Sequence, residues 1–407
     1  MLTLGFGAAY SCPAFADALA DEFGASQGGL SMVLAVATGA AFLVSAVGGP
    51  LADRVGARPV AMAGMALVGL GLALASVATS FEQLLLCYGG LVGLGVGLAY
   101  VPAIATVQRW FVRRRGLASG LALSGIGLGT ALVPVVAELP ARLGGDWRDA
   151  LLVCGALVAL GGVGGAALLT DPPPDRRMPG PDGEAAVPAT EGRALREVLG
   201  SRDFALLYGG TLLVSAPIAL PFAYLVGSAQ DGGVPRGEAL ALVGVVGLGS
   251  LPGRVVMGLL ADRLGRRAVF LFCCAGVATA TLFWAAAADR HAFNLFAAAF
   301  GVLYGGFVAL LPAFTADLFG RRAAAGTIGV LYTSRGFGVL AATPAFALGA
   351  VASGGYAPPL VAAAGLGLLG TGVLATVGAK SRSWRRPRAA RAVPYRAAID
   401  TVWWTKP

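Results

Sequence analysis

Charged side chains are scarce in this sequence. Asp, Glu, Lys and Arg together make up 13% of its 407 residues, whereas hydrophobic residues make up 57%. The surface of a soluble domain is roughly 25–35% charged residues, so this composition excludes an ordinary water-soluble fold. Long apolar runs separated by short basic loops are typical of helical proteins that cross a membrane several times.

Residues that commonly carry chemistry are few as well. His291 is the only histidine and lies beside Asp289 and Arg290 in an expected loop. We therefore expect its side chain to be solvated and to have no catalytic role. The five cysteines fall in apolar segments without the spacing of a metal site or a disulfide framework. The sequence contains no catalytic triad and no paired acid–base constellation. We therefore expect no enzyme activity, no cofactor and no metal.

The net charge of +9 reflects where the basic residues lie. Of the 30 Lys and Arg residues, 24 fall in loops on one side or in the tail, four on the other side and two inside apolar segments. Cytoplasmic loops of membrane proteins carry such an excess of positive charge. The distribution therefore indicates membrane orientation and argues against nucleic acid as a partner.

Twelve apolar segments reach the length of a membrane span. Because basic loops alternate with them, we expect a multi-pass protein of the plasma membrane with both termini in the cytoplasm. The first span begins at Met1 without a basic leader, so we do not expect a cleaved signal peptide. The expected spans are 1–20, 28–49, 60–79, 83–107, 117–138, 149–170, 203–228, 239–260, 268–287, 292–317, 323–349 and 357–379. The expected basic loops are 50–59, 108–116, 171–202, 261–267 and 318–322.

One charged turn occurs twice. The run from Gly49 to Arg58 (GPLADRVGAR) recurs from Gly258 to Arg267 (GLLADRLGRR), about half the chain later. An internal repeat of this length indicates two related halves. Its glycines permit a sharp turn and close helix approach, and its aspartate can cap a helix or pair with arginines. We call these residues the latch motif: Gly49, Asp53, Arg54, Gly56 and Arg58 in the first copy, and Gly258, Asp262, Arg263, Gly265 and Arg267 in the second.

The repeat divides the chain into an amino-terminal bundle over 1–170, a linker over 171–202, a carboxy-terminal bundle over 203–379 and a basic tail over 380–407. The proline-rich start of the linker predicts an extended, solvated segment. We expect the amphipathic stretch from Arg193 to Leu199 to lie along the membrane surface. The basic tail predicts contact with anionic lipids, and a partner-binding tail is the alternative.

Two arginines lie where charge is costly. Arg254 and Arg335 fall inside the eighth and eleventh apolar segments, and each costs about 2.5–3.5 kcal/mol at a helix centre. No acid is placed to neutralise both, so we expect Arg254, Arg335 and neighbouring Tyr332 to bind a small organic anion. The alternative is structural, with the arginines paired to Asp17, Asp317 or helix carbonyls.

Several segments resemble known transporters. The duplicated turn resembles the loop between the second and third helices of the major facilitator superfamily. The runs RWFVRRRGLASGLALSG (109–125) and PGRVVMG (252–258) resemble the fifth and eighth helices of its monocarboxylate-porter family. The segments ADLFG (316–320) and LYTSRG (331–336) resemble the oxalate/formate antiporter branch, although Arg335 stands where that branch has lysine. The resemblance implies an all-α membrane protein with twelve transmembrane helices in two pseudo-symmetric six-helix bundles.

The resemblance also implies that Arg254 contacts a substrate carboxylate, and two departures bear on coupling. Ser250 stands one turn before Arg254, where monocarboxylate porters have an acid. Ala14 follows Pro13, where they have a lysine. Exchange or uniport therefore becomes more plausible than proton symport by that mechanism. Asp17 and Glu138 are the remaining candidate proton sites.

We thus expect a secondary active transporter of mono- or dicarboxylates that works by alternating access. We favour a monomer. The arginine-rich composition indicates a bacterial source. Three alternatives stay open. The first is a carrier for drug efflux or for neutral solutes, which would tolerate neutral replacements of both arginines. The second is a non-transporting membrane sensor that signals through the basic tail. The third, a membrane enzyme, is disfavoured for lack of a catalytic cluster.

Overall fold

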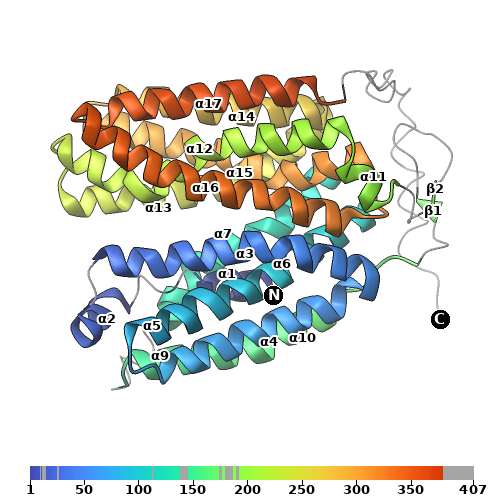
Figure 1. Ribbon diagram of the computed structural model, residues 1–407, viewed down its shortest axis with the longest axis horizontal. Coiled ribbons are helices and arrows are strands. Elements are labelled where there is room, and N and C mark those ends of the chain that lie inside the picture. Colours follow the sequence, from blue (N-terminus) through green and yellow to red (C-terminus); the bar gives the residue numbers. More distant parts are fainter. Residues whose placement is uncertain are drawn as a thin grey trace, which may run out of the picture.

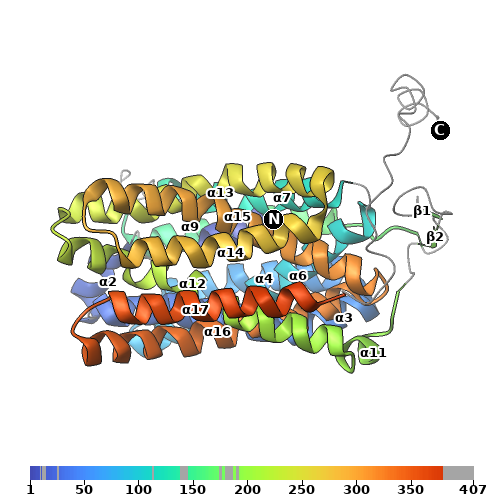
Figure 2. The same cartoon turned by 90° about the horizontal axis from the view of Figure 1, so that it is seen from above.

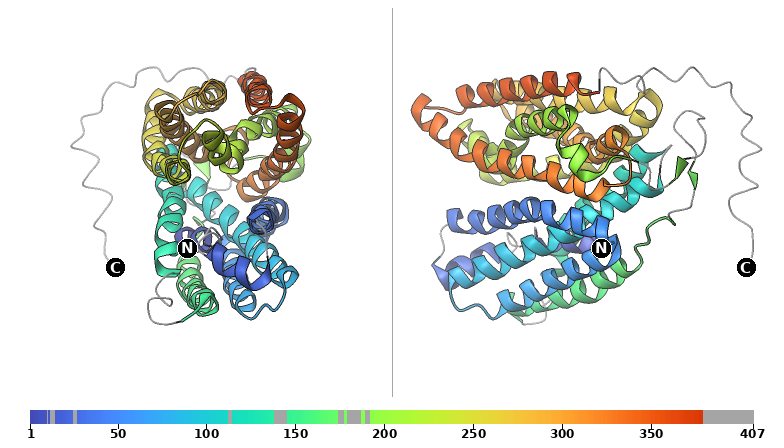
Figure 3. Two further views of the ribbon diagram at one scale, coloured as in Figure 1. Left: turned by 90° about the vertical axis from the view of Figure 1, so that its left-hand side faces the viewer. Right: turned by 45° about the vertical axis from the view of Figure 1, so that its right-hand side comes forward.

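The computed structural model describes residues 1–9, 11, 15–24, 27–111, 114–137, 145–173, 177–178, 187–188 and 192–378. Over this part the chain is almost entirely helical, and its long helices run side by side along one axis (Figure 1, Figure 2). Seen end-on, the helices of the first half form one bundle and those of the second half form another (Figure 3). The expected all-α fold with two helical bundles is confirmed.

The first half begins with two short helices and continues with long ones. A single stretch from Phe81 to Trp110 contains a π-helical segment, η2, and the stretch from Trp147 to Ala167 contains another, η3. The elements are α1 (Leu2–Ala9), α2 (Ala16–Phe23), α3 (Gln27–Val55), α4 (Ala57–Ser76), α5 (Phe81–Leu84), η2 (Leu85–Val92), α6 (Gly93–Trp110), α7 (Arg115–Ala137), α9 (Trp147–Leu157), η3 (Val158–Gly162) and α10 (Val163–Ala167).

The second half follows a linker that contains a two-stranded antiparallel ladder, β1 (Arg177–Met178) with β2 (Val187–Pro188). Its helices are α11 (Leu195–Leu199), α12 (Arg202–Asp231), α13 (Arg236–Leu264), α14 (Arg266–Ala285), α15 (Arg290–Phe319), α16 (Ala324–Ser353) and α17 (Ala357–Thr376). In the described part of the chain, ten helical stretches are long and apolar enough to cross a membrane. The other two expected spans, 1–20 and 117–138, include residues outside the described part.

The expected span over 1–20 is interrupted among its described residues. Helix α1 ends at Ala9, Ser11 is not helical, and α2 starts at Ala16. The Ser11 hydroxyl donates to the Ala8 carbonyl at 2.8 Å, and the buried Tyr88 hydroxyl donates to the same carbonyl. Such side-chain bonds to backbone carbonyls compete with continuation of the helix.

The two expected latch loops are also much shorter than 50–59 and 261–267. Helix α3 runs to Val55 and α4 begins at Ala57, so only Gly56 connects them, at φ +96°. In the second copy only Gly265 separates α13 from α14, at φ +102°. Both copies therefore place a glycine where the backbone is left-handed, a conformation that other residues adopt only with strain.

Glycines also permit the closest helix contacts. A Cβ atom on Gly93 or Gly97 of α6 would lie 2.4 Å or 2.3 Å from a carbonyl oxygen of α3, and one on Gly120 of α7 would lie 2.3 Å from the Arg254 carbonyl oxygen. Side chains at these positions would force the helices apart.

The end of the linker packs onto the protein. The Arg193 amide donates to the Phe319 carbonyl at 3.2 Å, Gly192 bridges to Gly320, and Val198 of α11 is fully buried. The stretch from Arg193 to Leu199 therefore lies against the second half, and its expected place along the membrane surface stays a prediction. The basic tail lies outside the described residues.

Candidate functional site

The latch motif lies at one end of the molecule, where α3, α6, α13 and α15 finish and α7 and α16 begin; we call it the latch end. Asp53, in the last turn of α3, accepts backbone hydrogen bonds from Ala325 at 3.2 Å and Gly326 at 2.6 Å in the first turn of α16. The carboxylate therefore faces the positive end of a helix dipole in the other half. Arg109 joins Asp53 to Asp171, which it contacts at 2.7 Å.

The second copy makes the mirror arrangement. Asp262, in the last turn of α13, accepts backbone hydrogen bonds from Gly116 at 3.0 Å and Leu117 at 2.9 Å in the first turn of α7. Arg266 bridges Asp262 at 3.1 Å and Asp317 at 2.8 Å, and Asp317 also pairs with Arg115. Each half thus caps one helix of the other half, and arginines hold each aspartate in place.

The arginines of the motif itself are not the partners of its aspartates. Arg54, Arg58 and Arg263 are exposed and form no ion pair with a described residue, and Arg267 donates to the Ala375 carbonyl of α17. Adjacent residues on a helix point in different directions, so Arg54 and Arg263 cannot reach the preceding aspartate. The structure instead brings Arg109, Arg115 and Arg266 to the latch. The sequence prediction missed Arg266 although it follows Asp262 by only four residues. Arg109 and Arg115 meet their partners only through the tertiary fold.

The two arginines expected in the membrane have different surroundings. Arg254 of α13 is 4% exposed, and its guanidinium donates to the Leu123 carbonyl of α7 in the other half. Arg254 therefore has a helix carbonyl as a partner, which is one of the structural alternatives considered for it. Asp317 is used by Arg115 and Arg266 at the latch end.

Arg335 of α16 lies among aromatic rings. It is 6% exposed, and its guanidinium carbon lies 4.9 Å from the ring centre of Phe42, 5.5 Å from that of Phe307 and 5.6 Å from that of Tyr332. It forms no ion pair or hydrogen bond with a residue in the described part of the chain. Phe42 belongs to α3, so both halves contribute to this aromatic cage, which we define as Phe42, Phe307 and Tyr332.

Tyr332 also meets the first half directly. Its ring stacks on that of Tyr100 of α6 with centres 5.4 Å apart, and the two hydroxyl oxygens are 3.2 Å apart. Arg335 and the two tyrosines therefore share one centre between the halves.

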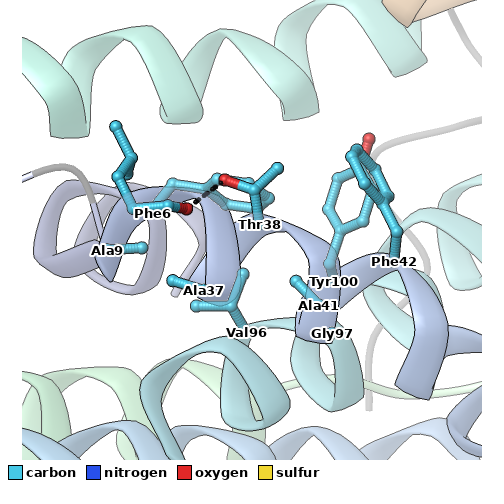
Figure 4. Close-up of a pocket in the computed structure, with 10 residues that line it drawn as sticks. Phe6, Ala9, Ala37, Thr38, Ala41, Phe42, Val96, Gly97 and Tyr100 are labelled. Carbon is cyan, nitrogen blue, oxygen red and sulfur yellow. Dashed lines mark hydrogen bonds between the residues drawn. The ribbon is translucent and has the colours of Figure 1, made fainter. Parts of the chain in front are cut away.

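A pocket in the first half ends at this centre. Figure 4 shows its lining, with Phe42 and Tyr100 side by side at one end and Ala9 toward the other. The hydroxyl of Thr38 donates to the Leu34 carbonyl at 2.9 Å, so it is already satisfied. We call this cavity the first-half pocket, and its lining is Phe6, Ala9, Leu34, Ala37, Thr38, Ala41, Phe42, Val96, Gly97 and Tyr100.

The remaining candidates contribute less. Glu138 lies outside the described residues, as does the side chain of Asp17. Ser250 is buried, and its hydroxyl donates to the Gly247 carbonyl at 2.8 Å. Among the described residues there is no cluster of His, Cys, Asp and Glu that could hold a metal ion.

This geometry defines a class of protein: a helical membrane protein of two bundles with a polar centre between them and a charged latch at one end. Comparison with known proteins identifies the family. The model of the Major Facilitator Superfamily matches residues 1–229 and again residues 209–403. The chain belongs to the major facilitator superfamily.

Several curated relatives are monocarboxylate transporters by name. The chain is 32% identical to monocarboxylate transporter 12-B of Danio rerio over 71% of this chain and 66% of the relative. It is 36% identical to human monocarboxylate transporter 11 over 61% and 51% of the two chains. The matches thus span between half and two thirds of these relatives' lengths. With monocarboxylate transporter 13 of Rattus norvegicus the identity is 30%, over 82% of this chain and 76% of the relative.

Solved structures agree on the fold. The chain superposes on the human organic anion transporter MFSD10 with a TM-score of 0.68, at 17% identity over 92% of this chain and 97% of that one. The fucose:proton symporter of E. coli gives 0.67, at 14% identity and the same coverage. At such low identity the likeness concerns the fold alone.

Proposed function

We propose that the protein is a secondary carrier of small organic anions, mono- or dicarboxylates, and that Arg335 binds the anion. One observation carries this proposal. A permanently charged guanidinium is buried between the two halves, with no ion pair to a described residue. Such a charge is costly in a membrane unless it meets water, a partner or a ligand. A substrate carboxylate would supply the missing negative charge.

The aromatic cage suits this role. Rings over the faces of a guanidinium stabilise it through cation–π attraction. They leave the N–H groups at its edge, where a carboxylate accepts two parallel hydrogen bonds. The Tyr332 hydroxyl lies in the same centre and can add a third donor. Arg254, bonded to the Leu123 carbonyl, supports the site by its positive charge and by joining the halves.

The relatives support the substrate class. Those described above are monocarboxylate transporters by name. Their names alone do not separate mono- from dicarboxylates for this chain, and the buried arginines suit either.

The two bundles and the latch support a mechanism of alternating access. We place the bundles at 1–170 and 203–379 and the latch end in the cytoplasm, because most of the basic residues lie at that end or in the linker and tail. The capped helices hold the halves together there, so this arrangement closes the cytoplasmic side. Transport requires that the caps of Asp53 and Asp262 break as the halves rock about the central site.

Exchange or uniport fits the site better than proton symport. Ser250 replaces the acid that would stand one turn before Arg254, and its hydroxyl is satisfied by a backbone carbonyl. Asp17 and Glu138 remain as candidate proton sites.

The test is uptake by proteoliposomes of labelled lactate, pyruvate, formate, oxalate and malonate, with and without internal anion and with a pH step. We expect at least one anion to be taken up by the wild type, and Arg335→Gln to abolish this uptake. Arg254→Gln should reduce it. Arg263→Gln, which neutralises an exposed arginine at the latch end, is the matched control and should transport normally.

Other outcomes would redirect the assignment. Stimulation by internal anion would identify an exchanger, and acceleration by a pH step would identify proton coupling. If a folded protein moves no anion, or if uptake survives both substitutions, the anion proposal is wrong and neutral solutes become the next candidates. Ligand binding without flux would favour a sensor.

A further inference from the structure

We infer that the preferred substrate has one anionic end and an apolar body, and that this body occupies the first-half pocket while the anionic end lies on Arg335. The inference rests on the proposed function and deepens it. Its basis is that the charged group of Arg335, in the second half, lies next to the apolar first-half pocket.

The first-half pocket offers almost nothing to a polar group. Eight of its ten lining residues are apolar or glycine. The two polar ones are already engaged, because Thr38 donates to the Leu34 carbonyl and Tyr100 shares a hydrogen bond with Tyr332. A polar substituent placed there would lose its hydration without gaining a partner, which is unfavourable. A hydrocarbon body would instead gain by leaving water.

The pocket and the charge are joined by two side chains. Phe42 lines the pocket, and the centre of its ring also lies 4.9 Å from the guanidinium carbon of Arg335. Tyr100 lines the pocket and stacks on Tyr332, the next member of the aromatic cage. A ligand whose anionic end meets the edge of the guanidinium therefore has its other end directed past these rings into the first-half pocket.

The arrangement disfavours a second charge on the ligand. No Lys or Arg lines the pocket, and Arg254 already donates to the Leu123 carbonyl of α7. The distal carboxylate of a dicarboxylate would therefore be buried against apolar side chains. A buried carboxylate without a partner is strongly penalised, so the site should reject such ligands.

An anion bound in this way touches both halves at once. Its charged end contacts α16 of the second half, and its body contacts α1, α3 and α6 of the first. The length and polarity of the body should therefore decide how well a substrate bridges the halves, separately from the charge that anchors it.

The test is the affinity of purified protein in lipid nanodiscs for acetate, butyrate, hexanoate and adipate, measured by calorimetry. Arg335→Gln protein serves as the blank for partition into lipid. Adipate has the same six carbons as hexanoate, with a second carboxylate in place of the terminal methyl group. We expect affinity to rise about fourfold for each CH₂ group that enters the pocket. Adipate should bind at least about tenfold more weakly than hexanoate.

A matched pair of variants tests the location. Ala41 of α3 lines the pocket, whereas Ala35 of the same helix is exposed. Ala41→Leu fills the pocket and should weaken hexanoate at least about tenfold, while acetate keeps its affinity within about twofold. Ala35→Leu adds the same side chain outside the pocket and should leave both affinities unchanged.

The ligand series in the wild type decides the question even if a variant does not fold. If binding depends on Arg335 but acetate, hexanoate and adipate bind alike, this inference is overturned and the anion function stands. If Ala41→Leu weakens acetate and hexanoate equally, the body does not lie in the first-half pocket. If no anion shows Arg335-dependent binding, the proposed function itself fails.

Discussion

Asp53 and Asp262 make the same contact in opposite directions across the interface between the halves. Each lies in the last turn of a helix in its own half and accepts two backbone hydrogen bonds from the first turn of a helix in the other half. Such a carboxylate satisfies amides that have no partner within their own helix and faces the positive end of its dipole. The two copies of the latch motif are therefore one device used twice.

Removing either aspartate should loosen the latch end. Asp53→Ala and Asp262→Ala each remove a helix cap, a change that costs about 0.5–2 kcal/mol. We expect each to raise the population with separated halves by about two- to thirtyfold, and the double variant to raise it further. The measurement is the distance between spin labels on two exposed sites of different halves, Arg58 and Arg263, by double electron–electron resonance.

Asp203 provides the control for this prediction. Its carboxylate accepts the Gly378 amide at 3.2 Å, so it makes the same kind of bond but within the second half. Asp203→Ala should leave the distance between the labels unchanged. If the two latch variants also leave it unchanged, the caps do not hold the halves together.

Close approach of α3 to α16 should depend on Gly49. A Cβ atom there would lie 2.2 Å from the Ala325 carbonyl oxygen, whereas one on Gly39 of the same helix would have its nearest neighbour, a Leu340 methyl carbon, at 3.9 Å. We expect Gly49→Ala to destabilise the protein by about 1–3 kcal/mol through overpacking. Gly39→Ala should be neutral, or stabilising by up to about 1 kcal/mol from helix propensity.

The readout is the midpoint of thermal unfolding of the two glycine variants in the same detergent. A lower midpoint for Gly49→Ala alone supports the packing. Equal midpoints would show that α3 and α16 can move apart without loss.

The paired hydroxyl groups of Tyr100 and Tyr332 should be coupled energetically. Either single change to Phe leaves the other hydroxyl buried without this partner, which costs about 1–3 kcal/mol, while the double change leaves neither. We expect the double variant to be less destabilised than the sum of the single variants. A double-mutant cycle on the free energy of unfolding measures this coupling, and strictly additive effects would argue against the bond.

Much of this structure follows from sequence. Apolar length and the distribution of Lys and Arg predict the spans, because the membrane demands continuous helices of fixed length. The repeat around Asp53 and Asp262 predicts two related halves and locates the latch. The buried positions of Arg254 and Arg335 also follow from the apolar segments around them.

The remaining features depend on contacts between distant segments. Nothing near Asp53 in the sequence indicates that Arg109 is its partner or that α16 receives its cap. The sequence around Phe42 and Phe307 contains no signal that they contact Arg335. Only the packing of the helices brings their rings close to its guanidinium. The break in the first span escaped prediction because it depends on hydrogen bonds to the Ala8 carbonyl from side chains that include the distant Tyr88.

The positive charge of Arg335 should be what binds the transported anion. The decisive measurement is saturable anion uptake by proteoliposomes that contain Arg335→Lys or Arg335→Gln protein. Lysine keeps the charge but loses the bidentate fork, so we expect uptake with a raised KM for Arg335→Lys and none for Arg335→Gln. Wild-type uptake by folded Arg335→Gln protein would show that this charge does not bind the anion.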